Sequence, residues 1–190
     1  MTLITADKAV QDLLYITPHL SRGGQNFLYV FAGWPVYIVP ITLLALFFRN
    51  TKDRANSVRL FIGSVFTWQI LNRLIGTYLY NNYGFRDRPF AATGAKEFFL
   101  ERPEKAFPSD HAAFLASFVI LLYAMGYKKL GNALLIVTII TGFARVMMGF
   151  HWPLDILAGW LVGGIGACIY LLVDPYIKTL LYKILKVKND

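Results

Sequence analysis

The sequence predicts an all-α integral membrane protein, a bundle of five transmembrane helices with an amphipathic interfacial helix at its N-terminus. Of the 190 residues, 56% are hydrophobic and the mean hydropathy is +0.49, both above the values of ordinary soluble domains. Apolar runs long enough to cross a bilayer recur along the chain. Basic residues gather at the ends of these runs, where positive charge sets topology. We therefore expect residues 1–190 to form one membrane-embedded domain.

The first expected element is an amphipathic helix over residues 5–17. Helical spacing separates an apolar side from a polar side: Ala6, Ala9, Val10, Leu13 and Leu14 against Asp7, Lys8, Gln11 and Asp12. Pro18 and the Ser-Arg-Gly-Gly stretch at 21–24 end this helix, so residues 1–26 are interpreted as an interfacial segment. The early charges interrupt any continuous apolar core, so we expect no cleavable signal sequence.

Five apolar runs are interpreted as membrane spans: residues 27–48, 60–80, 111–127, 132–148 and 153–173. Pro35 and Pro40 should kink the first span, and the second contains the polar residues Asn72 and Arg73. Two short basic connections are expected on one side of the membrane: residues 49–59, and a tight turn at Lys128, Lys129 and Gly131. A charge inside a span is costly, so Arg73 is expected either to pair with a polar group or to contact a substrate phosphate.

The longest connection, residues 81–107, is polar and contains several prolines and glycines. Connections of that length are functional or disordered, and we interpret residues 81–110 as an extracytoplasmic active-site loop. Ten Lys and Arg residues fall on the opposite side, against seven on the side of this loop. That bias places the tail in the cytoplasm and the site on the periplasmic face of the inner membrane.

Two stretches carry residues suited to phosphate chemistry. Ser109 opens an apolar run, where it can cap a helix whose first backbone N–H groups would hold an anion. About forty residues later, Arg145 presents a guanidinium fork suited to phosphate oxygens. His151 follows it, and Asp155 stands four residues further on, close enough to orient the imidazole. With His111, these residues indicate phosphoryl transfer.

The motifs together resemble a known family. Arg88-Pro89, Pro-Ser-Asp-His at 108–111, and Arg145, His151 and Asp155 at their spacings resemble the three-part signature of the type 2 phosphatidic acid phosphatase superfamily of membrane lipid phosphatases. Three positions depart from the family pattern: Asn81 stands where the family has Lys, Asp110 where it has Gly, and Ala144 where it often has Ser.

The resemblance implies a mechanism that the side-chain chemistry supports. His151 would attack phosphorus, Asp155 would hold its other ring nitrogen, and His111 would protonate the departing lipid oxygen. The phosphate oxygens would be held by Arg88, Arg145 and the Ser109-Asp110 turn, with Asn81 or Arg86 in place of the family lysine. Lys96 or Lys105 could also supply that charge. Sequence does not choose among these replacements.

No metal or other cofactor is expected. The chain has no His-Glu-x-x-His motif and no evident grouping of carboxylates, and its single cysteine, Cys168, lies within an apolar run. The net charge of +8 is carried mostly at the ends of apolar runs, where it meets anionic lipid, so no nucleic-acid partner is expected. The expected partners are the bilayer and a membrane lipid phosphate.

Each residue also has a structural alternative. The histidines can be interfacial, Asp155 can favour a helix N-terminus, and the two arginines can anchor spans at headgroup level. His19 has no partner at an informative spacing and is interpreted as interfacial. Ser109 lacks the Gly-x-Ser-x-Gly setting of a nucleophile.

The function that the sequence favours is a metal-independent lipid phosphatase. Arg-Asp-Arg-Pro-Phe at 86–90 and Pro-Ser-Asp-His-Ala at 108–112 are similar to the branch acting on undecaprenyl diphosphate. Lipid A 1-phosphate and phosphatidylglycerophosphate are substrates of neighbouring branches. The alternative is a non-enzymatic transporter or scaffold for phosphorylated lipids. Vanadate-dependent haloperoxidases share the phosphate-site architecture by resemblance, but they are soluble proteins.

Overall fold

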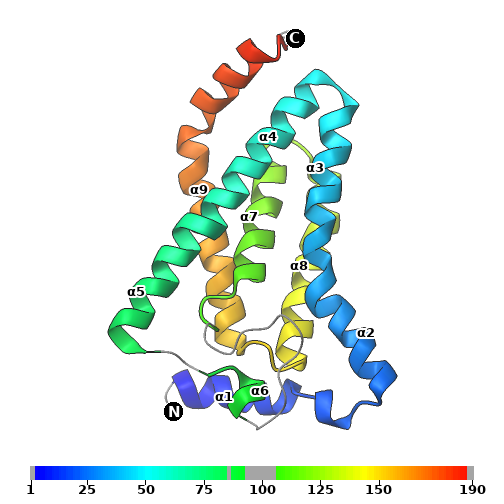
Figure 1. Cartoon of the computed structure of the whole chain (residues 1–190), viewed down its shortest axis with the longest axis vertical. Helices are drawn as coiled ribbons and strands as arrows, with labels where there is room; N and C mark the ends of the chain where they lie inside the picture. The colour runs from blue at the N-terminus through cyan, green and yellow to red at the C-terminus, as the bar shows by residue number, and fades with distance from the viewer. Residues whose placement is uncertain (1–2, 85–86, 93–105, 188–190) are drawn as a thin grey trace.

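The computed structural model describes residues 3–84, 87–92 and 106–187, and every regular element in these ranges is helical. Long helices run side by side along the molecule, while α1 and α6 lie across one end, which we call the foot (Figure 1). The elements are α1 (Leu3–Leu14), η1 (Thr17–His19), α2 (Arg22–Gly33), η2 (Trp34–Tyr37), α3 (Ile38–Arg49), α4 (Thr51–Val65), η3 (Phe66–Asn72), α5 (Arg73–Tyr83), α6 (Pro89–Ala92), α7 (Asp110–Ala124), α8 (Lys128–Met147) and α9 (Pro153–Ile184).

Three helical stretches in the described ranges are long and apolar enough to cross a membrane. They are Arg22–Arg49 with 28 residues, Lys128–Met147 with 20 and Pro153–Ile184 with 32. A helix rises ~1.5 Å per residue, so about 20 residues match the hydrocarbon core. A shorter apolar helix, α7, lies among them. The expected membrane character is therefore confirmed.

The first apolar stretch is interrupted where proline was expected to kink it. A 3-10 turn, η2, separates α2 from α3 and contains Pro35, which lacks the N–H that an α-helix would use. The stretch begins at Arg22, five residues earlier than predicted. Ser21 ends the preceding turn and accepts a hydrogen bond from the Gly24 N–H at 3.3 Å.

Two predicted connections and one predicted helix end were wrong. Residues 49–59 are not a loop: α4 begins at Thr51, because the Asn50 side chain accepts the Asp53 N–H at 2.8 Å and caps the helix. Lys128 belongs to the first turn of α8 instead of the connecting turn. The last helix continues through Pro175 to Ile184, well beyond residue 173.

The predicted loop is helical because its polar side chains have partners on other helices. Arg59 of α4 forms a buried ion pair with Asp174 of α9 and donates to Asn56 Oδ1 at 2.6 Å. Tyr127, in the turn before α8, donates to Asp53 and accepts from Asn56 Nδ2 at 2.9 Å. Burial, and then the hydrogen bond to Asp53, raise the pKa of Tyr127 to about 12. We call these five residues the distal network, because it lies far from the foot.

Glycines on α9 allow α7 to pack closely against it. A Cβ atom on Gly159 would lie 2.7 Å from the Ser109 carbonyl oxygen, and one on Gly163 would lie 2.6 Å from that of Ala113. The close approach permits a hydrogen bond from the Ser109 N–H to the Asp155 carbonyl at 3.1 Å. These glycines therefore bring the N-terminus of α7 against the first turn of α9.

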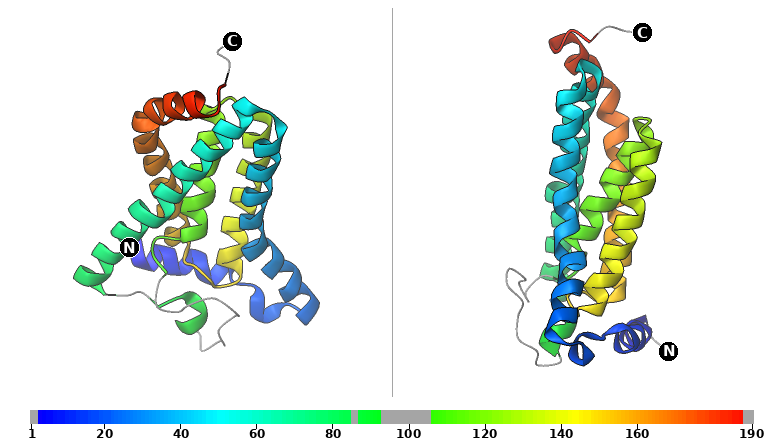
Figure 2. Two further views of the ribbon diagram at one scale, coloured as in Figure 1. Left: turned by 45° about the horizontal axis from the view of Figure 1, so that its top comes forward. Right: turned by 90° about the vertical axis from the view of Figure 1, so that its right-hand side faces the viewer.

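The N-terminal helix, expected over residues 5–17, spans Leu3–Leu14, and two of its polar residues face the protein. Asp7 and Gln11 are buried where α1 contacts α8 and α9, whereas Lys8 and Asp12 are exposed and form an ion pair at 2.7 Å. Figure 2 shows α1 lying across the ends of the long helices. The amphipathic pattern predicted the helix, and contacts with the bundle decided which side is buried.

Candidate active site

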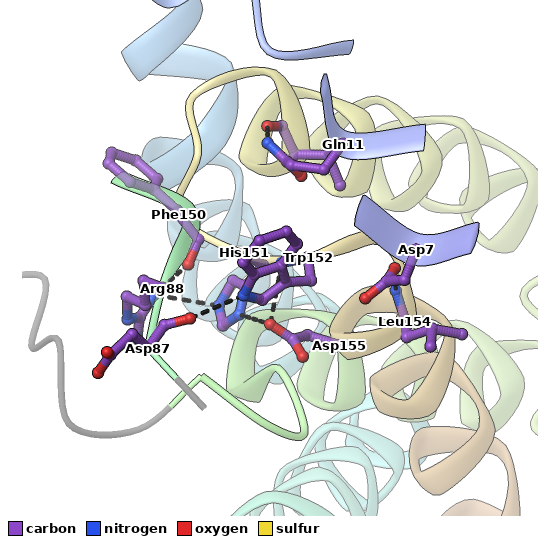
Figure 3. A network of polar contacts seen from close by, with 10 residues as sticks. Asp7, Gln11, Asp87, Arg88, Phe150, His151, Trp152, Leu154 and Asp155 are labelled. Carbon is purple, nitrogen blue, oxygen red and sulfur yellow. Dashed lines mark hydrogen bonds and ion pairs between the residues drawn. The ribbon is translucent and has the colours of Figure 1, made fainter. Parts of the chain in front are cut away.

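His151 lies in the connection between α8 and α9, with only 2% of its surface exposed. Its Nδ1 atom is 3.3 Å from Asp155 Oδ2, and the same carboxylate oxygen accepts the Trp152 N–H at 2.9 Å (Figure 3). Asp155 sits in the first turn of α9, where its charge favours the helix N-terminus. The carboxylate is thus held so that it can orient the imidazole, as the spacing predicted.

Arg88 approaches the other nitrogen of the same imidazole. Its Nη1 atom lies 3.4 Å from His151 Nε2 and donates to the Phe150 carbonyl at 2.6 Å. Two further bonds tie the residues around Arg88 to this connection: Trp152 Nε1 to the Asp87 carbonyl at 2.7 Å, and Phe90 N–H to the Gly149 carbonyl at 3.1 Å. The two motifs are about 60 residues apart in sequence, and the fold brings them together.

Arg145 stands in the last turn of α8 and is 1% exposed. Its Nη1 atom donates to the Ala32 carbonyl of α2 at 2.8 Å, and its guanidinium carbon lies 5.5 Å from the centre of the Phe150 ring. These contacts fix a cation beside the connection that carries His151.

The surroundings of His151 favour its neutral form. Burial lowers its pKa well below the ordinary value, and the positive charges of Arg145 and Arg88, followed by His111, lower it further. A hydrogen bond with the Ala106 backbone opposes this shift in the pKa. An imidazole must be neutral to act as a nucleophile, so the site keeps His151 in the form that nucleophilic attack needs.

The start of α7 brings His111 to the same place, but the predicted cap differs. Ser109 occupies the N-cap position, yet its side chain makes no capping hydrogen bond. Within the described ranges its buried Oγ atom has no hydrogen-bond partner. Its N–H is bonded to the Asp155 carbonyl, whereas the anion seat was expected at the N–H groups that follow Ser109 in the first turn of α7.

Comparison with known proteins identifies the family. The model of the PAP2 superfamily matches residues 57–178, well over half of the chain. The chain belongs to the PAP2 superfamily. It is a membrane lipid phosphatase of the PAP2 type, which confirms the resemblance carried by the signature residues.

Relatives and a solved structure agree with this membership. The bacitracin transport permease protein BcrC of Bacillus licheniformis is 30% identical over 149 residues, which cover 77% of this chain and 70% of that protein. The undecaprenyl-diphosphatase BcrC of Bacillus subtilis is 32% identical over 124 residues, covering 64% and 60%. The crystal structure of LpxE from Aquifex aeolicus superimposes with a TM-score of 0.56 at 22% identity, covering 86% of this chain and 93% of that one. At that identity the likeness shows a common fold.

Asp110, which replaces the glycine of the PAP2 pattern, accepts a hydrogen bond from Asn72 Nδ2 at 2.6 Å. Asn72 is fully buried in η3, a π-helical segment of a kind often found at functional sites. Sequence analysis gave Asn72 no role, although a polar side chain within an apolar run was a signal. The neighbouring Arg73 points outward and is exposed, with no ion pair to any described residue.

The fold leaves the missing PAP2 lysine unexplained. Asn81 is exposed near the end of α5, which leans away from the other long helices (Figure 1). Arg86, Lys96 and Lys105, which could replace the lysine, lie outside the described residues. Within the described ranges no three His, Cys, Asp or Glu side chains converge as they would around a metal ion.

Two residues of α1 that contact the helix ends beside His151 were not predicted from the sequence. Gln11 Nε2 donates to the Val146 carbonyl at 2.9 Å, and the Leu154 N–H donates to Asp7 Oδ1 at 2.9 Å. Their only signal was a polar pair at helical spacing, which equally suits a solvated face.

Proposed function

We propose that this PAP2 protein removes the terminal phosphate of a membrane lipid through a phosphohistidine at His151, without a metal ion. Undecaprenyl diphosphate is the first candidate substrate, because the Bacillus subtilis relative bears the name undecaprenyl-diphosphatase. Lipid A 1-phosphate and phosphatidylglycerophosphate are the next candidates. The observation that carries the proposal is the His151 ring held between the Asp155 carboxylate and the Arg88 guanidinium.

The first chemical step uses the two ring nitrogens differently. Nδ1–H donates to Asp155, which leaves the lone pair on Nε2 for attack on phosphorus. As the N–P bond forms, the bond from phosphorus to the lipid oxygen breaks, and His111 gives that oxygen a proton. Arg88 Nη1 lies 3.4 Å from Nε2, so a phosphate that enters here meets a guanidinium.

The second step returns the enzyme to its starting state. His111, now without its proton, takes one from water, whose oxygen attacks phosphorus and breaks the N–P bond. Inorganic phosphate leaves with His151 neutral again. Arg88 and Arg145 stabilise the charge on the equatorial oxygens in both steps, because positioning and electrostatics dominate phosphoryl transfer.

The proposed membrane arrangement has five crossings. Three are the long apolar stretches, the fourth is the helical stretch from α4 through α5, and the fifth is the shorter α7. Helix α1 would lie in the interface, since Ile4 and Leu13 are exposed while its buried polar residues face the bundle. The foot would face the periplasm and the C-terminus the cytoplasm, as the Lys and Arg bias favours.

Cysteines introduced at Thr93 and Asn189 should then react with impermeant reagents from opposite sides, and labelling from one side would refute five crossings.

The decisive experiment measures phosphate release by the purified protein from a panel of the three lipids in EDTA. We expect release from undecaprenyl diphosphate to be fastest. The competing function is transport of a phosphorylated lipid, which the name of the Bacillus licheniformis relative favours. Lipid movement across vesicles without phosphate release would support transport and overturn the phosphatase. Release that depends on a divalent cation would overturn the metal-independent mechanism.

A further inference from the structure

The N-terminal segment contacts the backbone of the connection that carries His151 through three side chains. Gln11 donates to the Val146 carbonyl at 2.9 Å, and Thr17 Oγ1 donates to the Met147 carbonyl at 2.8 Å. Asp7 accepts the Leu154 N–H at 2.9 Å. Figure 3 shows Asp7 and Gln11 on one side of the connection and Arg88 on the other.

These three bonds reach the two helix ends on either side of His151. The last turn of α8 contains Val146 and Met147, and Leu154 lies in the first turn of α9. Helix ends have backbone groups without partners inside the helix, and side chains from elsewhere commonly satisfy them. Here the donors and the acceptor come from about 130 to 147 residues earlier in the chain.

The same connection is also fixed by a close contact at Gly149. This glycine has a φ of 73°, and a Cβ atom there would lie 2.8 Å from the Tyr15 ring. On its other side the Gly149 carbonyl accepts the Phe90 N–H at 3.1 Å. The connection is therefore held between the N-terminal segment and residues 87–90.

We propose that Asp7, Gln11 and Thr17 are positioning residues for phosphoryl transfer. They hold the ends of α8 and α9 so that the His151 imidazole stays between Asp155 and Arg88. All three side chains are buried, so their hydrogen bonds are not exchanged for bonds to water. The inference rests on the proposed role of His151 as nucleophile. It assigns a function to a segment that precedes the part matched by the family model, residues 57–178.

The kinetic test removes one hydrogen bond at a time, and Gln11→Met and Thr17→Val also keep the side-chain shape. Gln11→Met, Thr17→Val and Asp7→Ala should each lower kcat by roughly 10- to 100-fold, since about 1 Å of misplacement can cost 100-fold, with KM changed little. Thr17→Ser and Asp7→Asn retain the hydrogen-bonding atom and should restore most of the rate. Asp12→Ala is the matched control, because Asp12 is an exposed acid on the same helix.

The effects of these substitutions on kcat should also depend on one another, because the residues hold the same connection. Gln11→Met and Thr17→Val act on adjacent carbonyls, so the double variant should lose less than the product of the two single losses. A role in stability alone predicts a different pattern, in which the fraction of folded protein falls while the kcat of the folded protein stays at the wild-type value. That pattern, or full activity in all three variants, would overturn the proposal.

A second measurement does not depend on catalysis. Hydrogen exchange at the backbone amides of residues 149–154 in the full chain should be faster in Gln11→Met and Thr17→Val than in wild type and Asp12→Ala. Unchanged exchange in both variants would overturn the positioning role. If the wild-type protein releases no phosphate, the proposed function fails, and exchange still decides whether the segment orders this connection.

Discussion

The two ends of the bundle use similar side chains for different purposes. In the distal network, Arg59 faces the Asp174 carboxylate, and the two buried charges neutralise each other. At the foot, Arg88 faces the imidazole of His151, and its charge together with that of Arg145 lowers the pKa of that histidine. Where a buried arginine meets a carboxylate, its charge is therefore balanced within the fold. Beside an imidazole it lowers the pKa of the ring instead.

The largest expected effect is loss of the nucleophile. His151→Ala should reduce phosphate release to background, because no N–P bond can form. Acid-quenched wild-type enzyme should contain phosphohistidine, detected with radiolabelled substrate, and the variant should contain none. His19→Ala is the matched control, since His19 is exposed in η1 and should leave turnover unchanged. Substantial turnover by His151→Ala would contradict the assignment.

The next largest expected effect is that of removing the positive charge of Arg145, beside the connection between α8 and α9. Arg145→Gln should lower kcat by roughly 10²- to 10³-fold, the loss typical of removing a group that stabilises transition-state charge. Arg145→Lys should retain more activity than Arg145→Gln, because it keeps the positive charge. It should stay below wild type, because lysine lacks the guanidinium that also donates to the Ala32 carbonyl. Arg22→Gln, at an exposed arginine, is the control. Equal rates for Arg145→Gln and wild type would remove Arg145 from the mechanism.

At the distal end the same kind of substitution should affect stability instead. Asp174→Asn leaves Arg59 charged and buried without its carboxylate, which should cost about 3–5 kcal/mol of unfolding free energy. Thermal unfolding in detergent measures this, and kcat of the folded protein should not change. The double variant Arg59→Met with Asp174→Leu should be close to wild type in stability. If the double variant is as unstable as Asp174→Asn, an uncompensated charge is not the cause.

The smallest effect is a shift in pH dependence. Because burial and two cations lower the pKa of His151, its neutral form persists to a pH below its ordinary pKa of about 6.5. In wild type, the pH at which kcat/KM falls to half its maximum on the acid side should therefore lie below about 6.5. Arg88→Gln removes one cation and raises the pKa of His151, so this half-maximal pH should move higher even if the maximal rate also falls. If the half-maximal pH stays in place or moves lower, Arg88 does not act on this imidazole.

The candidate site residues could be found from the sequence because they recur at fixed spacings along the chain. Arg145, His151 and Asp155 lie within eleven residues, and a four-residue step at a helix start places a carboxylate beside an imidazole. Arg88 and His111 came from their own motifs, and the fold brought them to the same place. The replacement for the lysine missing at Asn81 is still a prediction, as are the catalytic roles.

By itself the sequence determined that the chain is a helical membrane protein and that its candidate site residues lie in three motifs, because apolar content and local spacing need no tertiary contacts. Only the tertiary structure decided where polar residues find partners. Residues 51–59 are helical, and Arg59 among them meets Asp174 of α9; two polar residues of α1 are buried, and one of them, Gln11, meets the Val146 carbonyl. Ser109 makes no capping bond with its side chain, and its N–H bonds to the Asp155 carbonyl of α9. A hydrogen bond satisfies a buried polar group equally well from any distance along the chain, so periodicity cannot predict which partner it will have.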